Sequence, residues 1–416
     1  MSNYIIEHEN IIIVSGKPYI YKNGVYKCDS DGNILRYLIK SMMVQEIITI
    51  TKINRVYNLI LANHKLTVGN EDVNQYPSYW INFKNGMLDV LTGEMHEHSP
   101  RYLSINQIPH NYVPDRDITE TTFFKFLQSR IPDKENQQML FEFMGYCMTK
   151  DVIFQKFMIL FGLGECGKST IINFTTNMVG KENACSISLQ QLGDRFTTAY
   201  LLFKTLNTCG DMTNSALTDS GIIKKLSGDD CIKAEYKGGE VFFFWNHAKM
   251  MFSCNELPKV LDDKTNGFYR RLLIVRFSES GEFIPGLREK LSSESEFESV
   301  ISGCITALRN ALSRGKIFES GSNFEEVEQL RADSDTVAAF IGDCATVDSD
   351  FKILRSDLYE YYKEYCTEEG RTSMGKHAFF KALRTKGYAD RKTNGLWYFF
   401  GLDVGWKEIK RELFNK

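Results

Sequence analysis

The stretch Gly162–Ser169, GLGECGKS, decides the fold because it satisfies the pattern G-x-x-x-x-G-K-S of a phosphate-binding loop. The apolar run Lys156–Phe161 before it predicts a buried strand, and Thr170–Val179 after it predicts a helix that ends at Gly180. Strand, glycine loop and helix in this order are the context that the motif requires. Glycine lets the backbone wrap a polyphosphate with its amide groups pointing inward, and the helix N-terminus adds partial positive charge.

Each position of the loop has a role that follows from its chemistry. Lys168 is expected to reach the β- and γ-phosphates of a nucleotide, and Ser169 is expected to hold Mg²⁺. The residues expected to bind the nucleotide are Gly162, Gly164, Glu165, Cys166, Gly167, Lys168, Ser169 and Thr170.

Length and composition set the class of protein. A chain of 416 residues suggests two to four domains, and 43% hydrophobic with 25% charged residues is ordinary for a soluble globular protein. The net charge of -3 neither implies nor excludes a nucleic-acid partner. Ten scattered cysteines without C-x-x-C or zinc spacing indicate reduced thiols in a cytosolic protein. There is no signal-peptide pattern and no apolar run long enough for a membrane span, so a cytoplasmic location is expected.

Four segments are predicted along the chain. Residues 1–78 form an N-terminal α+β region in which we read no motif. Residues 79–150 end in apolar residues at helical spacing, which Pro132-Asp133 divides into two helices. Strand and helix patterns alternate within residues 151–330, as in an α/β nucleotide-binding core. Residues 335–416 form a small last domain.

This last domain has the pattern of a winged helix. Two predicted helices, Leu354–Tyr365 and Gly375–Lys386, precede a hairpin around Asn394-Gly395. The aromatic residues here are read as core rather than as base-stacking groups; they are Tyr359, Tyr361, Tyr362, Tyr365, Phe379, Phe380, Trp397 and Tyr398.

A carboxylate and an amide follow later strands of the core. The strand Leu206–Cys209 is followed by Asp211, where an acid would complete the Mg²⁺ shell and polarise water; Asp219 and Asp229 are rival candidates. The apolar run Ala248–Cys254 delivers Asn255, whose neutral amide could bind the attacking water or the γ-phosphate. The alternatives are a solvent-facing aspartate and a turn-forming asparagine before a proline.

Two arginines, Arg270 and Arg271, precede the strand pattern Leu272–Phe277. A guanidinium group stabilises the charge of phosphoryl transfer, so either residue, supplied by a neighbouring subunit, would be an arginine finger and would imply a ring. The alternative is a pair of surface cations.

The order of these motifs resembles the superfamily 3 helicases, in the branch of phage, plasmid, mobile-island and poxvirus-type primase-helicases. The resemblance covers about residues 80 to 400, and Ile81–Asp89 with His98–Pro100 resembles the helical collar before that family's motor. It implies ATP and Mg²⁺ as cofactors. It also implies roles for individual residues. Lys168 and Ser169 match the family's first motif, and Asp211 matches the second. Asn255 matches the sensor and Arg271 the arginine finger, with Arg270 as the second candidate for the finger.

Between the second motif and the sensor, Ala234–Gly239 occupies the place of the family's DNA-contacting hairpin. Lys237 matches the hairpin lysine, although Gly238 follows where a basic or aromatic residue is common. Lys233 is the secondary candidate, and Tyr236 is a candidate for a stacking or backbone contact.

Family members often carry an N-terminal primase-polymerase domain. Only about 80 residues precede the collar-like segment here, without a zinc pattern or a clustered acidic pair. The resemblance therefore implies a helicase without primase activity in this chain, and a separate primase as a candidate partner.

A local excess of positive charge marks the last domain. From Arg371 to Lys392 the chain has seven basic residues and one acid, which is the electrostatic footprint of DNA binding. The candidate DNA contacts are Lys376, His377, Lys381, Arg384, Arg391 and Lys392. A basic face without a nucleic-acid partner is the alternative.

The expected fold is α/β: a P-loop AAA+-like ATPase core with an N-terminal α+β region, a helical collar and a C-terminal winged-helix domain. The expected function is that of an ATP-dependent replicative DNA helicase or initiator of a phage, plasmid or mobile element. It would be a homo-oligomeric ring, a hexamer, that translocates on single-stranded DNA and binds duplex origin DNA. One alternative is an ATP-switched origin-binding protein that melts or marks DNA without processive unwinding. A ring ATPase acting on protein is disfavoured by Lys237 at the hairpin position.

Overall fold

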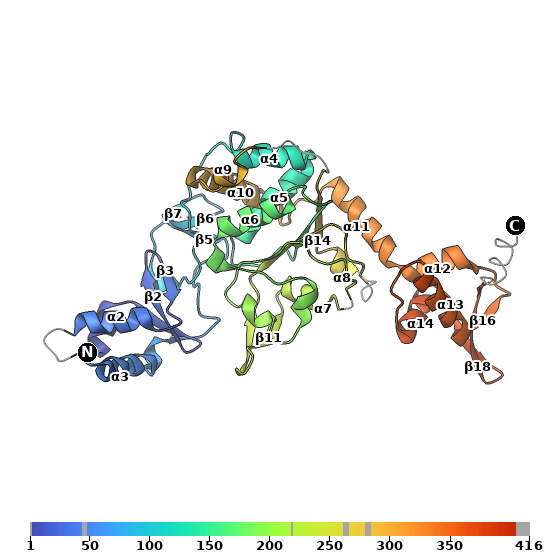
Figure 1. Cartoon of the computed structure of the whole chain (residues 1–416), viewed down its shortest axis with the longest axis horizontal. Coiled ribbons are helices and arrows are strands. Elements are labelled where there is room, and N and C mark those ends of the chain that lie inside the picture. Colours follow the sequence, from blue (N-terminus) through green and yellow to red (C-terminus); the bar gives the residue numbers. More distant parts are fainter. Residues whose placement is uncertain (1, 44–47, 218, 261–265, 279–283, 405–416) are drawn as a thin grey trace. The chain divides into compact units, whose positions relative to one another are not determined.

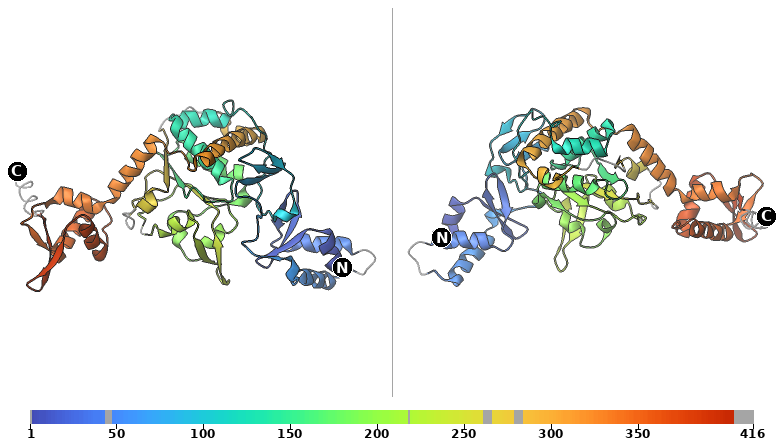
Figure 2. Two further views of the ribbon diagram at one scale, coloured as in Figure 1. Left: turned by 180° about the vertical axis from the view of Figure 1, so that it is seen from behind. Right: turned by 45° about the horizontal axis from the view of Figure 1, so that its top comes forward.

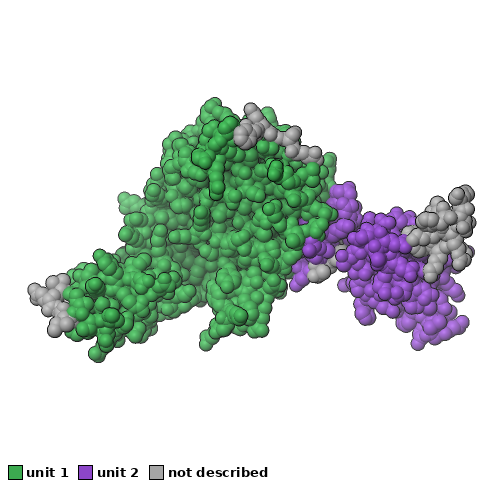
Figure 3. All heavy atoms as spheres, in the orientation of Figure 1, with its two compact units in different colours: residues 1–214, 221–257, 267–327 green, residues 215–220, 258–266, 328–416 purple. Residues whose placement is uncertain are grey.

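A computed structural model describes residues 2–43, 48–217, 219–260, 266–278 and 284–404. The chain forms two compact units, shown in different colours in Figure 3. Unit 1 comprises residues 1–214, 221–257 and 267–327, and unit 2 comprises residues 215–220, 258–266 and 328–416. Within the described ranges, every helix is too short or too polar to span a bilayer.

A five-stranded parallel sheet forms the centre of unit 1, with the strand order β14-β8-β13-β10-β9. Its strands are β8 (Phe157–Phe161), β9 (Ala184–Cys185), β10 (Leu206–Cys209), β13 (Lys249–Cys254) and β14 (Leu272–Arg276). All six residues of β13 are buried, as expected for a parallel sheet covered on both faces. Because the strands are parallel, their carboxyl ends meet at one edge, which we call the carboxyl edge.

Helices cover one face of this sheet (Figure 1). They are α4 (Thr122–Arg130), α5 (Lys134–Cys147), α6 (Lys168–Val179), α9 (Leu287–Lys290) and α10 (Glu294–Arg314). The predicted division at Pro132-Asp133 is confirmed, and the Asp133 side chain caps α5 by accepting from the Glu135 amide. Their apolar faces form the largest core cluster, which includes Phe123, Phe143 and Phe297.

A hairpin projects from the opposite face of the sheet, beside helix α7 (Gly221–Leu226) (Figures 1 and 2). It consists of the antiparallel strands β11 (Cys231–Glu235) and β12 (Val241–Trp245). Helix α8 (Asn266–Tyr269) precedes β14.

The N-terminal part of unit 1 contains two small sheets. The first has the order β3-β2-β1-β4 and the second β5-β6-β7. The elements in chain order are α1 (Ser2–His8), β1 (Ile11–Val14), β2 (Lys17–Lys22), β3 (Val25–Cys28), α2 (Asn33–Met42), α3 (Ile50–Leu61), β4 (Thr67–Val68), β5 (Trp80–Phe83), β6 (Gly86–Asp89) and β7 (Met95–His96).

Unit 2 packs three helices against a three-stranded antiparallel sheet of order β16-β18-β17. Helix α11 (Gly321–Ser334) precedes these elements, which are α12 (Thr336–Cys344), β15 (Ala345–Thr346), β16 (Lys352–Leu354), α13 (Arg355–Glu368), α14 (Lys376–Thr385), β17 (Asp390–Thr393), β18 (Leu396–Phe400) and β19 (Asp403–Val404). The predicted hairpin turn is confirmed: Asn394 and Gly395 have φ values of 50° and 83°, as a two-residue turn of this kind requires.

Most of the aromatic residues of unit 2 form its core, as predicted. Tyr362, Tyr365, Phe379 and Phe380 are all buried. The prediction is wrong for Trp397, which is 45% exposed. It lies beside the hairpin turn, where β18 extends beyond the helices that cover Phe399.

Candidate functional site

Three segments that the sequence singled out meet at the carboxyl edge of the central sheet. Strand β8 leads into the glycine loop, β13 ends one residue before Asn255, and β10 ends two residues before Asp211. The backbone amide of Met212 donates to the Ser253 carbonyl over 2.8 Å, which extends the pairing of β10 with β13. Since adjacent strands lie about 5 Å apart, Asp211 and Asn255 leave the sheet side by side.

Lys168 is the buried centre of this edge, with 4% of its surface exposed. Its Nζ atom donates to the carbonyl oxygens of Gly162 and Leu163 over 2.7 and 2.8 Å and to Oδ1 of Asn255 over 2.9 Å. The Cys166 Sγ atom lies 3.4 Å from the same nitrogen. The lysine therefore joins the glycine loop to the end of β13.

The backbone of the loop has a shape that its glycines make possible. Gly167 has a φ of 100°, and a Cβ atom there would lie 2.6 Å from Cζ of Phe126 on α4. Glu165 also has a positive φ, 63°, which is uncommon for a residue with a side chain. Successive left-handed turns of this kind direct backbone amides into a concavity, so the loop fits a polyphosphate.

The remaining loop positions lie around this concavity. Cys166 is buried, Ser169 is exposed in the first turn of α6, and Thr170 is half-buried beside it. A Cβ atom on Gly162 would lie 3.0 Å from Cβ of Phe277, whereas Gly164 has open space around it. Arg130 lies next to the loop, because its Cγ atom would be 3.6 Å from a Cβ atom on Gly167. Sequence reasoning had not identified this arginine.

Asp211 is exposed, with a φ of 52°, and its backbone amide donates to Oγ of Ser253 over 3.3 Å. A second carboxylate, Glu256, follows Asn255 directly and accepts a 2.7 Å hydrogen bond from Nδ2 of Asn214. Sequence reasoning had not considered Glu256, although it stands in the same motif as Asn255. Of the rival acids, Asp219 belongs to unit 2, and Asp229 lines a separate cavity of about 450 Å³ together with Gln155 and His247.

Arg270 and Arg271 lie at the other edge of the sheet. They precede β14, whose first residue pairs with Phe157, the first residue of β8. Arg271 is 9% exposed, and its guanidinium group donates to the Gly267 carbonyl over 2.7 Å and to Oε1 of Gln155 over 3.3 Å. Arg270 is exposed and contacts the same Gln155 oxygen over 3.0 Å. Within one chain, neither arginine is brought to the loop.

The amino edge of the sheet, opposite the carboxyl edge, also holds a buried lysine, Lys249, and the half-buried His247. The Lys249 ammonium donates to the carbonyl oxygens of Thr149, Asp151 and His247. Burial lowers the pKa of Lys249 to about 7. Burial, with the nearby Lys249 charge, also lowers the pKa of His247 to about 4. These groups therefore favour their neutral forms more than they do in water.

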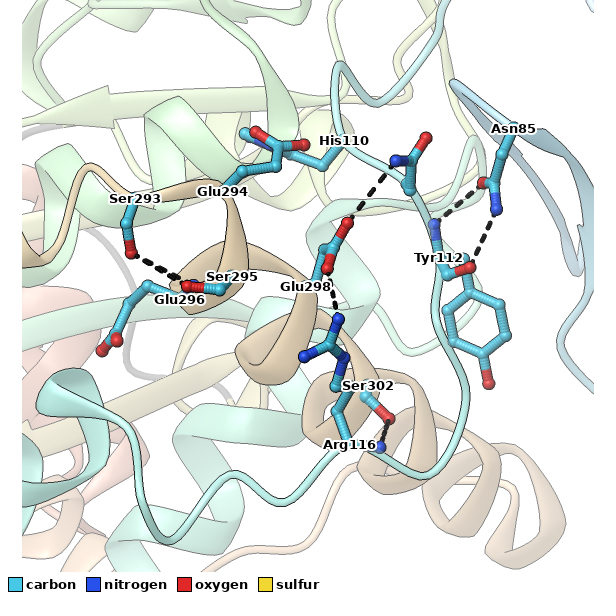
Figure 4. Close-up of polar contacts among 11 residues, drawn as sticks. Asn85, His110, Tyr112, Arg116, Ser293, Glu294, Ser295, Glu296, Glu298 and Ser302 are labelled. Carbon is cyan, nitrogen blue, oxygen red and sulfur yellow. Dashed lines mark hydrogen bonds and ion pairs between the residues drawn. The ribbon is translucent and has the colours of Figure 1, made fainter.

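The segment before α4 is fastened to α10 by polar contacts, drawn in Figure 4. The ring of His110 places Nδ1 3.0 Å from a Glu294 carboxylate oxygen and Nε2 3.2 Å from the carbonyl of Asn177 in the last turn of α6. Arg116 donates to Glu298 over 2.8 Å. These contacts tie the candidate collar segment to the helix that begins at the glycine loop.

The projecting hairpin carries the candidate DNA contacts of unit 1. Lys233 and Lys237 are exposed, and Lys237 lies in the turn before Gly238, which has a φ of 77°. Tyr236 is also exposed, at 43%, but it is held in place: its hydroxyl donates to the Ala199 carbonyl over 3.0 Å and its ring stacks on Phe242.

The candidate DNA contacts of unit 2 differ in how they are held. Lys376, His377 and Lys381 lie on the exposed face of α14. The guanidinium group of Arg384 forms two hydrogen bonds, of 2.7 and 2.8 Å, with the carboxylate of Asp390 and lowers the pKa of that carboxyl group.

The hairpin of β17 and β18 presents both charged and apolar side chains on its surface. Arg391 and Lys392 on β17 are exposed. On the paired strand β18, Leu396 and Trp397 are 51% and 45% exposed, which the sequence had not indicated, and Trp397 lies opposite Lys392.

Family comparisons account for most of the chain. The family described as "D5 N terminal like" matches residues 7–136, and the family "Poxvirus D5 protein-like" matches residues 332–400. Between them, a family of unknown function, DUF5906, matches residues 160–271. The resemblance to the D5-type primase-helicase family is confirmed. It begins near residue 7 rather than near residue 80, so the N-terminal region, in which no motif was recognised, is part of the D5-type pattern.

Two individual proteins are similar to parts of this chain. The mimivirus protein "Putative helicase L207/L206" from Acanthamoeba polyphaga mimivirus is 25% identical over 219 residues, which is 48% of this chain. The chain spans 22% of the length of that protein. The uncharacterized mitochondrial protein ymf21 of Marchantia polymorpha is 25% identical over 160 residues, which cover 36% of this chain and 87% of that protein.

Solved structures show the same fold. The C-terminal region of NrS-1 superposes with a TM-score of 0.53 at 11% sequence identity, over 96% of this chain and 98% of that one. A second apo structure of this region gives a TM-score of 0.52 at 11% sequence identity, with 96% of this chain and 97% of that chain covered. The mixed α/β fold with a parallel sheet is thereby confirmed.

Proposed function

We propose that the chain is an ATP-dependent DNA helicase that works as a ring, with a P-loop motor of the AAA+ type in unit 1. The contact between Lys168 and Asn255 carries this proposal, because it unites the phosphate loop with a neutral amide where a γ-phosphate would end. The loop's left-handed backbone and the first turn of α6 supply amide donors for the phosphates. ATP bound there provides the reactive phosphoanhydride bond.

The protein's own side chains divide the catalytic work. Lys168 balances charge on the outer phosphates, and Ser169 with Asp211 would hold Mg²⁺. Asn255 orients the attacking water without adding charge. Glu256, which accepts a hydrogen bond from Asn214, would supply a second carboxylate beside Asp211 and would accept a proton from the attacking water.

An arginine from the next subunit would complete the site. Arg270 and Arg271 lie at the edge of the sheet away from the loop of their own chain, which suits action in trans. The sequence favoured Arg271. Its burial and its bonds to Gly267 and Gln155 support a positioning role, whereas the exposed Arg270 is better placed to reach a neighbouring subunit. We therefore assign the finger to Arg270.

DNA would be bound at two places. In a hexameric ring the exposed Lys237, with Lys233 on β11, would face single-stranded DNA, and Tyr236 would brace the hairpin through Ala199. Unit 2 would act as a winged helix on duplex origin DNA, with Lys376, His377 and Lys381 of α14 toward the groove and Arg391 and Lys392 of the hairpin on phosphate. The chain would then have four domains: an N-terminal region (1–78), a collar (79–150), a motor (151–330) and a DNA-binding domain (335–416).

Strand displacement on forked DNA tests this function. We expect the full chain to separate the strands with ATP and not with a non-hydrolysable analogue, and blunt duplexes to be poor substrates. ATP hydrolysis that is stimulated by DNA without any strand displacement would instead favour an ATP-switched initiator that marks or melts an origin.

A further inference from the structure

The hairpin of β17 and β18 projects from unit 2 (Figure 1), and its register decides which side chains share a face. Residues that pair directly in an antiparallel hairpin have side chains on one face, and successive residues alternate between faces. Trp397 pairs with Lys392. Phe399, two residues later, pairs with Asp390 and therefore lies on the same face as Trp397. Phe399 is fully buried, with its ring 5.6 Å from that of Phe380 on α14, so this is the face that the helices cover.

Trp397 is held on this face by a cation. Cζ of Arg355, the first residue of α13, lies 5.1 Å from the centre of the Trp397 ring and 4.3 Å from the centre of the Phe380 ring. A guanidinium group over an aromatic ring is attracted by the π electrons. Asp390 fixes the same guanidinium group through an ion pair of 3.3 Å. The indole ring is therefore positioned beside α14, yet Trp397 keeps 45% of its surface exposed.

The surroundings of this ring are basic. Arg391 and Lys392 are exposed on β17. Asp390 is the only acid in the sequence of residues 390–400, and its side chain is 7% exposed because Arg384 binds its carboxylate through two hydrogen bonds. The charge that the hairpin presents to solvent is therefore positive. An exposed aromatic ring beside cations matches a nucleotide, whose base stacks and whose phosphate is negative.

The form of the nucleic acid follows from the aromatic surface that it offers. In an uninterrupted duplex each base is stacked between its neighbours, and a side chain enters only by unstacking a base step. An unpaired base has a face available for stacking on a protein ring. The exposed Lys376 and Lys381 of α14 serve the duplex itself, and the contacts of Arg355 with Phe380 and Trp397 place the indole next to this helix.

We propose that Trp397 stacks on the unpaired base at which duplex DNA becomes single-stranded, so that unit 2 recognises the junction. The inference rests on the DNA binding proposed for unit 2. It adds a ligand for the exposed ring, because contacts to phosphate alone would use only the cations of the hairpin.

The test uses three DNAs that share one duplex. The first has blunt ends, the second has an unpaired strand at one end, and the third has the same unpaired strand without its bases. The third DNA keeps the phosphates of the second and removes only the groups that stack. Dissociation constants for the full chain are measured by fluorescence anisotropy without ATP. In a second readout, 2-aminopurine at the first unpaired position reports stacking by a loss of its fluorescence.

Three variants separate stacking from other contacts. Trp397→Ala removes the ring, and Trp397→Phe keeps an aromatic surface. Leu396→Ala is the matched control, because Leu396 is 51% exposed on the same strand but pairs with Thr393 on the opposite face of the hairpin. Thermal unfolding is the folding control for each variant. Any contact of the unit 1 hairpin with the unpaired strand is the same in all of these proteins.

We expect the wild type to bind the base-bearing overhang at least about tenfold more tightly than the other two DNAs, as one stacked base allows. Trp397→Ala should bind this overhang about tenfold less tightly than the wild type, keep its affinity for the blunt duplex, and leave 2-aminopurine fluorescent. Trp397→Phe should retain most of the wild-type affinity, and Leu396→Ala should behave as the wild type.

Wild-type affinity of Trp397→Ala for the base-bearing overhang, or an equal loss of affinity for all three DNAs, would overturn the stacking role. Unchanged DNA binding by Trp397→Ala with a changed mass of the assembly would also overturn it, and would assign the ring to a contact between copies of the chain. A wild type that binds none of the three DNAs would overturn the proposed function itself.

Discussion

The Nζ atom of Lys168 donates a 2.9 Å hydrogen bond to Oδ1 of Asn255, a residue 87 positions later in the chain. The bond spans two adjacent strands, because Lys168 follows the loop after β8 and Asn255 follows β13, which pairs with β8. A charged donor and a neutral acceptor are thus fixed together at the carboxyl edge before any substrate arrives.

Asn255→Ala should lower the turnover number for ATP hydrolysis by about 10²-fold, the usual cost of losing one preorganised polar group at a reacting centre. The fold should persist, since Asn255 is exposed and Lys168 keeps its bonds to the Gly162 and Leu163 carbonyls. Steady-state hydrolysis and nucleotide binding are measured to separate a loss of turnover from a loss of binding. Asn58→Ala on α3 is the control. Unchanged turnover would remove Asn255 from the mechanism.

Arg270→Ala should abolish hydrolysis with an unchanged melting temperature. Arg271→Ala should lower the melting temperature, because Arg271 is buried against Gly267 and Gln155. Mixing Arg270→Ala chains with Lys168→Ala chains should restore part of the activity. In mixed rings some interfaces combine an intact loop with an intact arginine from the neighbour. If no mixing ratio restores activity, the arginine does not act across an interface.

Stability should fall as the pH drops from about 6.5 to about 4. Burial lowers the pKa of His247 to about 4 in the folded chain, below its ordinary value of 6.5. Between these values the unfolded chain binds more protons than the folded chain, so acidification favours unfolding. Lys249, with its pKa lowered to about 7, acts in the same direction at higher pH. Denaturant unfolding of wild type and His247→Gln at several pH values checks this. The variant should lose roughly 1–3 kcal/mol of the pH dependence, and parallel pH profiles of the two proteins would contradict it.

Lys381→Ala should weaken binding to duplex DNA and reduce the salt dependence by about one unit of slope, as the loss of one phosphate contact does. Arg384→Ala provides the comparison on the same helix, because its guanidinium group is held by Asp390. Its main effect should be on thermal stability. Fluorescence anisotropy over a series of salt concentrations measures DNA binding by the two variants. If the affinity of Lys381→Ala depends on salt as steeply as that of the wild type, Lys381 makes no phosphate contact.

The parts of the site that could be predicted from sequence are those that depend on local geometry. The glycine loop imposes its own backbone, so its strand and helix follow from adjacent residues. Asp211 and Asn255 were placed correctly at strand ends because parallel strands share a carboxyl edge.

Other features depend on contacts between distant segments. The ranking of Arg271 over Arg270 could not include Gln155, which lies before β8 and holds the Arg271 guanidinium group. Glu256 is distinguished from an ordinary surface acid by its hydrogen bond from Asn214, a residue 42 positions earlier in the chain. Trp397 has a large aromatic side chain of the kind that usually lies in a core. It is exposed because it lies near the turn of the hairpin that contains β18.

The central claim is that the carboxyl edge of unit 1 hydrolyses ATP in response to single-stranded DNA. The most direct measurement is the rate of ATP hydrolysis by the full chain and by Lys168→Ala, each with and without single-stranded DNA, alongside the mass of the assembly. We expect the wild type to hydrolyse ATP, DNA to raise the rate, and Lys168→Ala to be inactive while folded and assembled. Normal hydrolysis by Lys168→Ala, or a wild-type rate that ignores DNA, would contradict the account.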